Sequence, residues 1–335
     1  MSFRRIALFL CLILIVALIV DLLSGSSSFG FSGVLHALKA GPNGDSIVQQ
    51  IVWQLRLPRV LASLLAGSVL AVSGFQMQTL FRNPLAGPYE LGLSAGAGVG
   101  VACFVLIGWQ GPSFLAQAGL FGAAAIGSLA VMGLLGLLAP LLRSAPALLL
   151  AGLLLSSGLG ALISGMQAFS GAEALQSFVN WTLGRMGGVT WGQLAWLAPI
   201  CAIGLIAAAF SSKPLTALML GEDEARSLGS NVKATRLFTA ACASILAAAV
   251  TAFCGPIAFI GLGMPHVARW LLGRTDPGAL IPGSALLGAI ALLLCDSASQ
   301  TILPGRVLPV NVVASALGAP LALLLLLRYQ RRNDS

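Results

Sequence analysis

The sequence predicts an all-α membrane protein that crosses a lipid bilayer about ten times. Of its 335 residues, 58% are hydrophobic and only 8% are charged, and the mean hydropathy is +0.96. Soluble domains carry about 25% charged residues, so this chain cannot cover a surface that faces water. It also contains 40 glycines, and small residues let membrane helices approach one another closely.

Ten apolar segments follow one another along the chain, and a membrane helix needs roughly 20 such residues. The first, about 6–23, exceeds the ~7–15 apolar residues of a signal peptide and has no clear cleavage site after it, so we expect a helix. The whole chain, 1–335, is expected to form one transmembrane domain with its core helices within about 58–327. Their approximate bounds are 58–81, 91–107, 115–139, 147–169, 191–210, 237–254, 257–272, 279–301 and 310–327.

The eighth segment is short and is interrupted by Gly255, Pro256, Gly261, Gly263 and Pro265. Broken helices at membrane depth are tolerated only where protein or a water-filled cavity covers the freed backbone. The pattern therefore predicts either a covered break inside the bundle or a helical hairpin that faces the aqueous phase.

The basic residues indicate topology rather than a nucleic-acid surface. The formal charge is +8, but lysines and arginines stand singly between apolar stretches, so we expect no nucleic-acid partner. Ten crossings place both termini on one side. If that side is the cytoplasm, inside segments hold 13 of the 18 basic residues and outside segments hold the other 5, as the positive-inside rule requires.

A weak internal repeat links the second and seventh segments. Residues 59–66 read RVLASLLA and residues 236–243 read RLFTAACA. The first stretch enters the membrane from outside and the second from inside. The pair therefore suits an inverted repeat of helices 2–5 and 7–10, an arrangement that transporters use.

The longest inside loop, about 211–236, carries the signature of a short helix. Glu222, Asp223 and Glu224 precede Arg226, and Gly229 follows. Acids favour the positive N-terminal end of a helix, and glycine commonly ends one. The loop is either a solvated connector or a docking helix for a cytoplasmic partner, and the residues alone leave both open.

Enzymatic chemistry has little support in the sequence. No G-x-x-x-x-G-K-[ST] loop occurs, so any ATP-driven step needs another polypeptide. The six cysteines lack C-x-x-C spacing and the two histidines are far apart, so no metal site is expected. Residues 92–96 match G-x-S-x-G, but close packing explains these glycines, and a serine hydrolase would need His266 beside Ser94.

Few polar side chains lie inside the expected helices. Asp296, near the outer end of the ninth helix, suits either a proton relay in a proton-coupled secondary transporter or hydrogen bonding at a helix end. We favour hydrogen bonding, because no second acid deep in a helix is expected to pass the proton on. Small polar faces on the fifth and tenth helices suit either tight packing or a wide conduit, and they consist of Ser156, Ser157, Ser164, Asn311 and Ser315.

Six stretches resemble, in the same order, the FecCD-type permeases, the membrane subunits of bacterial ATP-binding-cassette (ABC) importers for ferric siderophores, haem and cobalamin. They are residues 56–61, 81–88, 91–97, 221–229, 255–269 and 308–320. The resemblance implies the type II ABC importer architecture in the bacterial inner membrane. It implies transport of a chelate by alternating access, with ferric siderophore the commonest substrate and haem or cobalamin next.

The resemblance also implies a set of partners. A second permease copy, usually identical, would face this one across a central path. Two cytoplasmic ATPase subunits and a periplasmic or lipoprotein binding protein would complete the importer. ATP and magnesium would bind to the ATPases, and this chain would hold no cofactor and catalyse no reaction itself.

The resemblance assigns roles to individual residues as well. The binding protein would dock on Arg56, Arg59 and Arg306, although Gln300 stands where the family usually has its third rim arginine. Ser144 and Ala145 would form a cytoplasmic gate, and the path would run between helices five and ten. The segment coupled to the ATPase would consist of Gly221, Glu222, Asp223, Glu224, Ala225, Arg226, Leu228 and Gly229.

Overall fold

Every regular element that the structure describes is a helix. The computed structural model describes residues 3–25, 29–42, 46–107, 113–142, 145–184, 186–303 and 306–333. The long helices are α1 (Phe3–Leu23), α4 (Leu57–Leu80), α5 (Leu93–Ile107), α6 (Ser113–Leu142), α7 (Ala145–Ala168), α9 (Trp191–Phe210), α12 (Val232–Cys254), α13 (Ile260–Leu272), α14 (Pro277–Thr301) and α15 (Val310–Asn333). The shorter elements are α2 (Gly30–Ala40), α3 (Ile47–Gln50), the π-helical turn η1 (Ile51–Arg56), α8 (Ala172–Thr182), the 3-10 turn η2 (Met186–Gly188), α10 (Ser212–Leu220) and α11 (Glu222–Ser227).

The ten long helices fall where the sequence predicted membrane segments. Seven helical stretches among the described residues are long and apolar enough to cross a bilayer. The apolar parts of α5 and α15 are shorter, and α13 has only 13 residues. The all-α membrane architecture is therefore confirmed, while the number of crossings is approximate.

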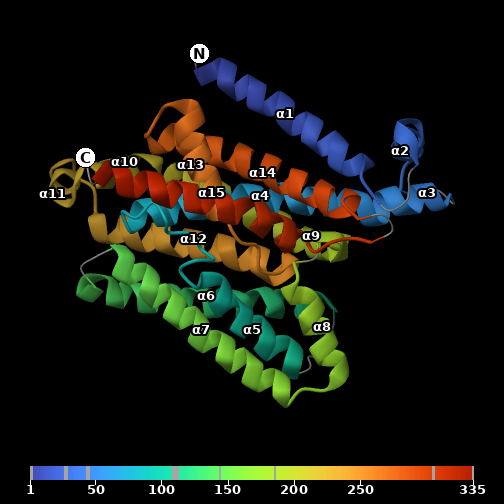
Figure 1. Cartoon of the computed structure of the whole chain (residues 1–335), viewed down its shortest axis with the longest axis horizontal. Helices are drawn as coiled ribbons and strands as arrows, with labels where there is room; N and C mark the ends of the chain where they lie inside the picture. Colours follow the sequence, from blue (N-terminus) through green and yellow to red (C-terminus); the bar gives the residue numbers. More distant parts are fainter. Residues whose placement is uncertain are drawn as a thin grey trace.

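Helix α4 lies at the centre of the bundle, packed against α14 and α12 (Figure 1). Gly67 of α4 faces Gly288 of α14 so closely that a Cβ atom on either would collide with the carbonyl oxygen of the other. Gly74 meets the backbone of Gly261 on α13 in the same way. Van der Waals packing at such close crossings drives the association of membrane helices, which explains the abundance of glycine.

Helix α5 packs on α6 through the glycines of the G-x-S-x-G stretch and the residues after it. A Cβ on Gly96 would collide with the backbone of Gly127, and one on Gly100 with the backbone of Ala123. The packing interpretation of this motif is therefore confirmed. His266 donates instead to the carbonyl of Pro84, at 2.6 Å.

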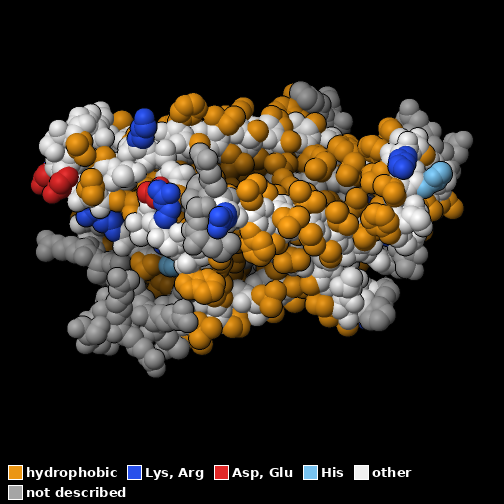
Figure 2. Space-filling model, turned by 90° about the horizontal axis from the view of Figure 1, so that it is seen from above, with side chains coloured by type: hydrophobic (Ala, Val, Ile, Leu, Met, Phe, Trp, Pro, Cys, Tyr) orange, Lys and Arg blue, Asp and Glu red, His pale blue; other side chains and the backbone are white. Residues whose placement is uncertain are grey.

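The surface shows a broad apolar band between two more polar ends (Figure 2). Helix α1 illustrates the band, because the exposed fractions of Leu8, Leu12 and Ile15 are 71%, 58% and 54%. Such side chains are suited to lipid, and the bilayer core is about 30 Å thick. The start of α1 and the end of α15 both lie toward the end of the bundle that carries α11 (Figure 1), as an even number of crossings requires.

The predicted break separates α12 from α13. Gly255 has a φ of +79° and approaches the carbonyl of Trp181, and Phe259 takes the left-handed conformation just before α13 begins. The freed backbone is covered by protein. The buried amide of Ala258 donates to the Oδ1 atom of Asn311, at 3.0 Å. The structure thus supports a covered break and not a hairpin that faces water.

Four short helices among the described elements were not predicted, and one of them, α10, lies in the loop just before α11. Helices α2 and α3 occupy the polar stretch between α1 and η1, and α8 follows α7 after a turn. Helix α8 has 11 residues, of which only Phe178 is buried. Such short segments lack the long apolar run by which the membrane helices were recognised.

Candidate functional site

Helices α10 and α11 form a small folded unit at one end of the bundle (Figure 1). The unit has its own apolar core, made of Leu215, Ala217, Leu218, Ala225 and Val232. Because Ala225 is only 1% exposed, it anchors α11 and cannot form part of an outer contact surface. The short helix that the sequence predicted at this place is confirmed.

The acidic start of α11 is tied back to nearby arginines. Glu222 pairs with Arg236 and also lies 3.4 Å from Arg226, whose Nη1 atom is 2.9 Å from Asp223. Three acids in the first turn complement the positive end of the helix dipole. The Asp223 side chain is 91% exposed and Leu228 is 65% exposed, so these two residues present the outward face.

The glycines that flank α11 have the conformations expected of helix boundaries. Gly221 has a φ of +143° before the helix and Gly229 a φ of +77° after it. Both values lie where residues with a Cβ atom are strained. The conformation of the predicted coupling segment is thus explained residue by residue, while its docking role stays a prediction.

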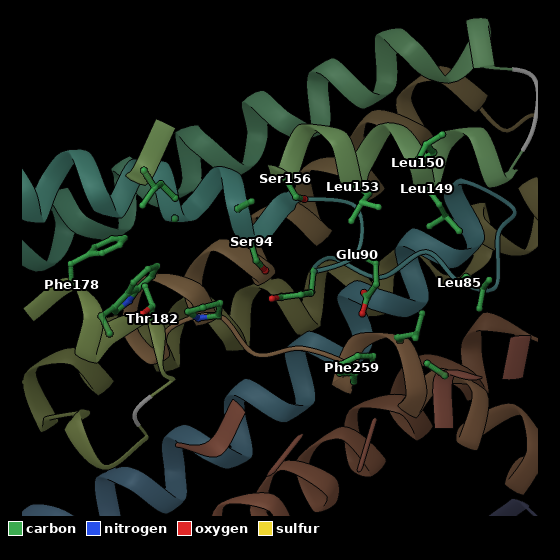
Figure 3. A pocket seen from close by; sticks show the side chains of 18 of the residues that line it. Leu85, Glu90, Ser94, Leu149, Leu150, Leu153, Ser156, Phe178, Thr182 and Phe259 are labelled. Carbon is green, nitrogen blue, oxygen red and sulfur yellow. The ribbon is translucent and has the colours of Figure 1, made fainter. Parts of the chain in front are cut away.

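A cavity of about 910 Å³ lies between α5, α7, α8, α13 and α15 (Figure 3). Its walls are mostly apolar and include the aromatic side chains of Tyr89, Phe178, Trp181 and Phe259. The rings of Phe178 and Trp181 lie 5.2 Å apart. The cavity touches both α7 and α15, the two helices that the resemblance assigned to the path, and its use as the path stays a prediction.

Of the five polar residues predicted for the path, Ser156 lines this cavity. Its hydroxyl donates to the carbonyl of Gly152, at 2.8 Å. Ser157 and Ser164 are exposed on α7 and are not among the residues that line the cavity. Asn311 closes the α12–α13 break and Ser315 is half-buried on α15, and neither is among the residues that line the cavity.

Glu90, in the connection between α4 and α5, brings a carboxylate to the cavity wall (Figure 3). Both carboxylate oxygens are buried, and neither makes a hydrogen bond with the described residues. Burial raises the pKa of the Glu90 carboxyl to about 7, and the backbone amides of Glu90 and Phe259 offset only part of that rise. This burial could not be predicted from the sequence, because Glu90 stands in a turn between two apolar segments.

At the end of the bundle opposite α11, two acids and an arginine meet in the interior. The Nε atom of Arg59 lies 2.8 Å from Oδ2 of Asp296, and its Nη2 atom lies 3.7 Å from Oδ1 of Asp21. Only 11% of the Arg59 side chain is exposed. Gln300 donates to Asp21, at 3.4 Å, so the residue at the family's third arginine position joins the same cluster.

Arg56 lies beside this cluster and is 3% exposed. Its Nη1 atom donates to the carbonyls of Leu22 and Leu23, at 3.0 and 3.1 Å, and its guanidinium lies 5.2 Å from the ring centre of Phe29. Arg56 thus contacts the end of α1, and Arg59 links α1 to α14. The sequence could not show that α1 packs there. The docking role of the two arginines stays a prediction.

The environment of Asp296 differs from the expectation. The sequence suggested a hydrogen-bonding role near a helix end and no acidic neighbour, whereas the structure gives an ion pair with Arg59 and places Asp21 in the same cluster. Asp21 is on α1 and Asp296 on α14, 275 positions apart, so only the fold brings them together. Arg306 is exposed, and its docking role stays a prediction.

Comparison with known proteins agrees with this arrangement. Residues 13–328 match the profile of the FecCD transport family. The chain belongs to that family. The vitamin B12 import system permease proteins BtuC of Salmonella paratyphi A and Salmonella typhi are 42% identical to it over 286 residues, which is 84% of each chain.

A solved structure extends the similarity to the fold. An inward-facing ABC transporter of the metal-chelate type superposes with a TM-score of 0.79 at 28% identity, covering 97% of this chain and 99% of that one. The architecture of the chain is thus that of an ABC importer permease of the FecCD family. The predicted gate of such a permease is incompletely placed here, because Ser144 lies outside the described residues and Ala145 is the first residue of α7.

Proposed function

We propose that the chain is the permease subunit of an ABC importer that carries a bulky metal chelate from the periplasm into the cytoplasm. It would work in the inner membrane with both termini in the cytoplasm. A ferric siderophore is the first candidate substrate, and cobalamin or haem comes next. The proposed assembly contains two copies of this chain, two ATPase subunits and a substrate-binding protein.

The observation that carries the proposal is the exposed acidic face of α11. The helix is anchored by Ala225 and stiffened by the pairs between Glu222, Asp223 and Arg226. A rigid helix of this kind can transmit the movement of a soluble subunit to the bundle, because α10 packs on α14 and α11 packs on α12. Closure of the ATPases on ATP would rock the two permease copies between outward-open and inward-open states.

The cavity supports a large and weakly held substrate. Its walls offer apolar and aromatic surface with few polar groups, and such a surface permits contact with a bulky chelate without a rigid set of hydrogen bonds. A conduit must bind its solute weakly enough to release it. The relatives named for vitamin B12 and the solved transporter of the metal-chelate type agree with a substrate of this size.

The docking role can be tested with variants of α11 that leave its anchor intact. Asp223→Arg and Leu228→Asp change exposed side chains, so each should alter stability by no more than about 0–1 kcal/mol. The double variant should lose most ATP-driven chelate uptake in proteoliposomes that contain the ATPase and binding protein. Glu173→Arg, which changes an exposed acid on α8, is the matched control and should keep wild-type uptake.

A second measurement separates docking from folding. Binding of the purified ATPase to the permease in nanodiscs should weaken in the double variant and stay unchanged in Glu173→Arg. Wild-type coupled uptake by the double variant would contradict a docking role for α11.

A further inference from the structure

Glu90 is the only Asp, Glu, Lys or Arg among the described residues that line the cavity. The other polar members of the wall are hydroxyl and amide side chains, such as Ser94, Ser156 and Gln167. Tyr89 contributes a phenol. The electrostatic character of this space is thus dominated by one carboxylate.

The space that the carboxylate occupies is made by a glycine. A Cβ atom on Gly87 would collide with the Oε2 atom of Glu90 and would lie 3.5 Å from the amide nitrogen of Leu262. The carboxylate of Glu90 therefore lies toward the start of α13. Figure 3 shows Glu90 above Phe259, the residue that precedes this helix. The positive end of α13 favours a negative charge there.

No cation among the described residues neutralises Glu90. On α13, His266 donates to Pro84, and Arg269 donates to Gln78 at 2.7 Å. Arg82, in the same connection as Glu90, reaches the carbonyl of Leu218. The nearby basic side chains are thus engaged elsewhere, and the described ion pairs do not include Glu90.

We propose that Glu90 is a specificity-determining residue that makes the path favour cationic chelates over uncharged ones and uncharged chelates over anionic ones. A buried unpaired carboxylate repels an anion more strongly than it would in water, because the effective dielectric constant is low. A cation gains from the same carboxylate and from the aromatic faces of Phe178 and Trp181. The inference rests on the proposed function, since it assumes that the chelate passes through this cavity.

The test uses the complete permease–ATPase complex in nanodiscs, without nucleotide and without the binding protein. Equilibrium dialysis with radioactive iron measures the affinity for three probes of similar size. They are a cationic trihydroxamate iron chelate, an uncharged trihydroxamate iron chelate and a trianionic tricatecholate iron chelate. The compared proteins are wild type, Glu90→Gln, which keeps the shape of the side chain, and Glu173→Gln, the same change on the exposed face of α8.

At about pH 8, where Glu90 is ionised, wild type and Glu173→Gln should bind the cationic probe about tenfold more tightly than the uncharged one, as expected for unit charges about 12 Å apart at an effective dielectric constant of about 20. In Glu90→Gln this ratio should fall to near one, and the trianionic probe should gain affinity. The wild-type preference should also weaken as the pH falls below about 7, where Glu90 takes up a proton.

The ratio distinguishes charge selection from a structural role. If Glu90 only holds the start of α13, Glu90→Gln would change the affinity for all three probes by the same factor, and the proposal would be overturned. Equal wild-type affinities, or no binding of any probe, would also overturn it. The proposed function is judged separately by ATP-driven uptake with the binding protein present, so either idea can fail without the other.

Discussion

Replacement of Arg59 by glutamine should destabilise the permease strongly, although Arg59 lies near an end of the bundle. The change removes the cation that, among the described residues, pairs with both Asp21 and Asp296, whose side chains are 0% and 4% exposed. Breaking a buried pair by removing one partner costs about 3–5 kcal/mol, because a charge is left buried without compensation. At roughly 2 °C per kcal/mol for a chain of this size, the melting temperature should fall by about 6–10 °C.

The matched control is Arg226→Gln on α11. Arg226 also pairs with two acids, Glu222 and Asp223, but its side chain is 61% exposed. Exposed pairs contribute about 0–1 kcal/mol, so this variant should melt within about 2 °C of wild type. Melting is followed by size-exclusion chromatography of heated, detergent-purified protein.

Two further observations decide between the internal role of Arg59 and a docking role. The double variant Arg59→Gln, Asp296→Asn should recover part of the lost stability, because it removes a carboxylate together with the arginine. Equal melting of Arg59→Gln and Arg226→Gln, with weaker affinity for the binding protein in Arg59→Gln alone, would refute the buried-cluster account. It would support the predicted docking role of Arg59.

Three more predictions concern packing, the helix break and pH. Gly67→Ala should lower the free energy of unfolding by about 1–3 kcal/mol or more, because the new Cβ atom would meet a backbone carbonyl of α14. A Cβ atom on Gly122 would have no neighbour within 4 Å, so Gly122→Ala should not destabilise the protein. Asn311→Ala should lower the free energy of unfolding by about 1–3 kcal/mol, because it leaves the buried amide of Ala258 without an acceptor. Ser315→Ala should leave that free energy nearly unchanged. Equal melting temperatures of the two variants would contradict the role of Asn311 at the helix break. Because burial raises the pKa of Glu90 from 4.5 to about 7, its neutral form stabilises the fold below pH 4.5, and that contribution is lost as the pH rises through 7. Wild type should therefore lose stability relative to Glu90→Gln between about pH 5 and about pH 8, and a pH-independent difference would be the contrary result.

The membrane helices and α11 were predictable from sequence because their signals are local. Length and apolarity identify the long helices, and the acids at 222–224 with Gly229 identify the short one. The break before α13 was likewise visible in its glycines and prolines. These features depend on neighbouring residues along the chain, which a sequence shows directly.

The charged interior was not predictable, because its partners are distant in sequence. Nothing around Arg59 indicates that Asp21 and Asp296 lie beside it, and an arginine near a helix end more simply suggests a rim position. Glu90 posed the same difficulty, since its burial depends on Gly87 and on the start of α13. Side-chain roles that depend on three helices meeting need the fold before they can be assigned.

Arg306 is the exposed member of the predicted docking set. Arg306→Glu should weaken association with the binding protein, and added salt should reduce the wild-type affinity toward that of the variant, because rim charges act through screened electrostatics. An affinity that neither the substitution nor salt changes would remove Arg306 from the contact surface.

The most direct measurement of the central claim compares energy sources for the same protein in sealed liposomes. The chain alone, given a proton gradient and an iron chelate, should accumulate none of the chelate and hydrolyse no ATP. Addition of the ATPase, the binding protein and ATP should start accumulation without any gradient. Gradient-driven accumulation by the chain alone would contradict the account and would favour a proton-coupled transporter.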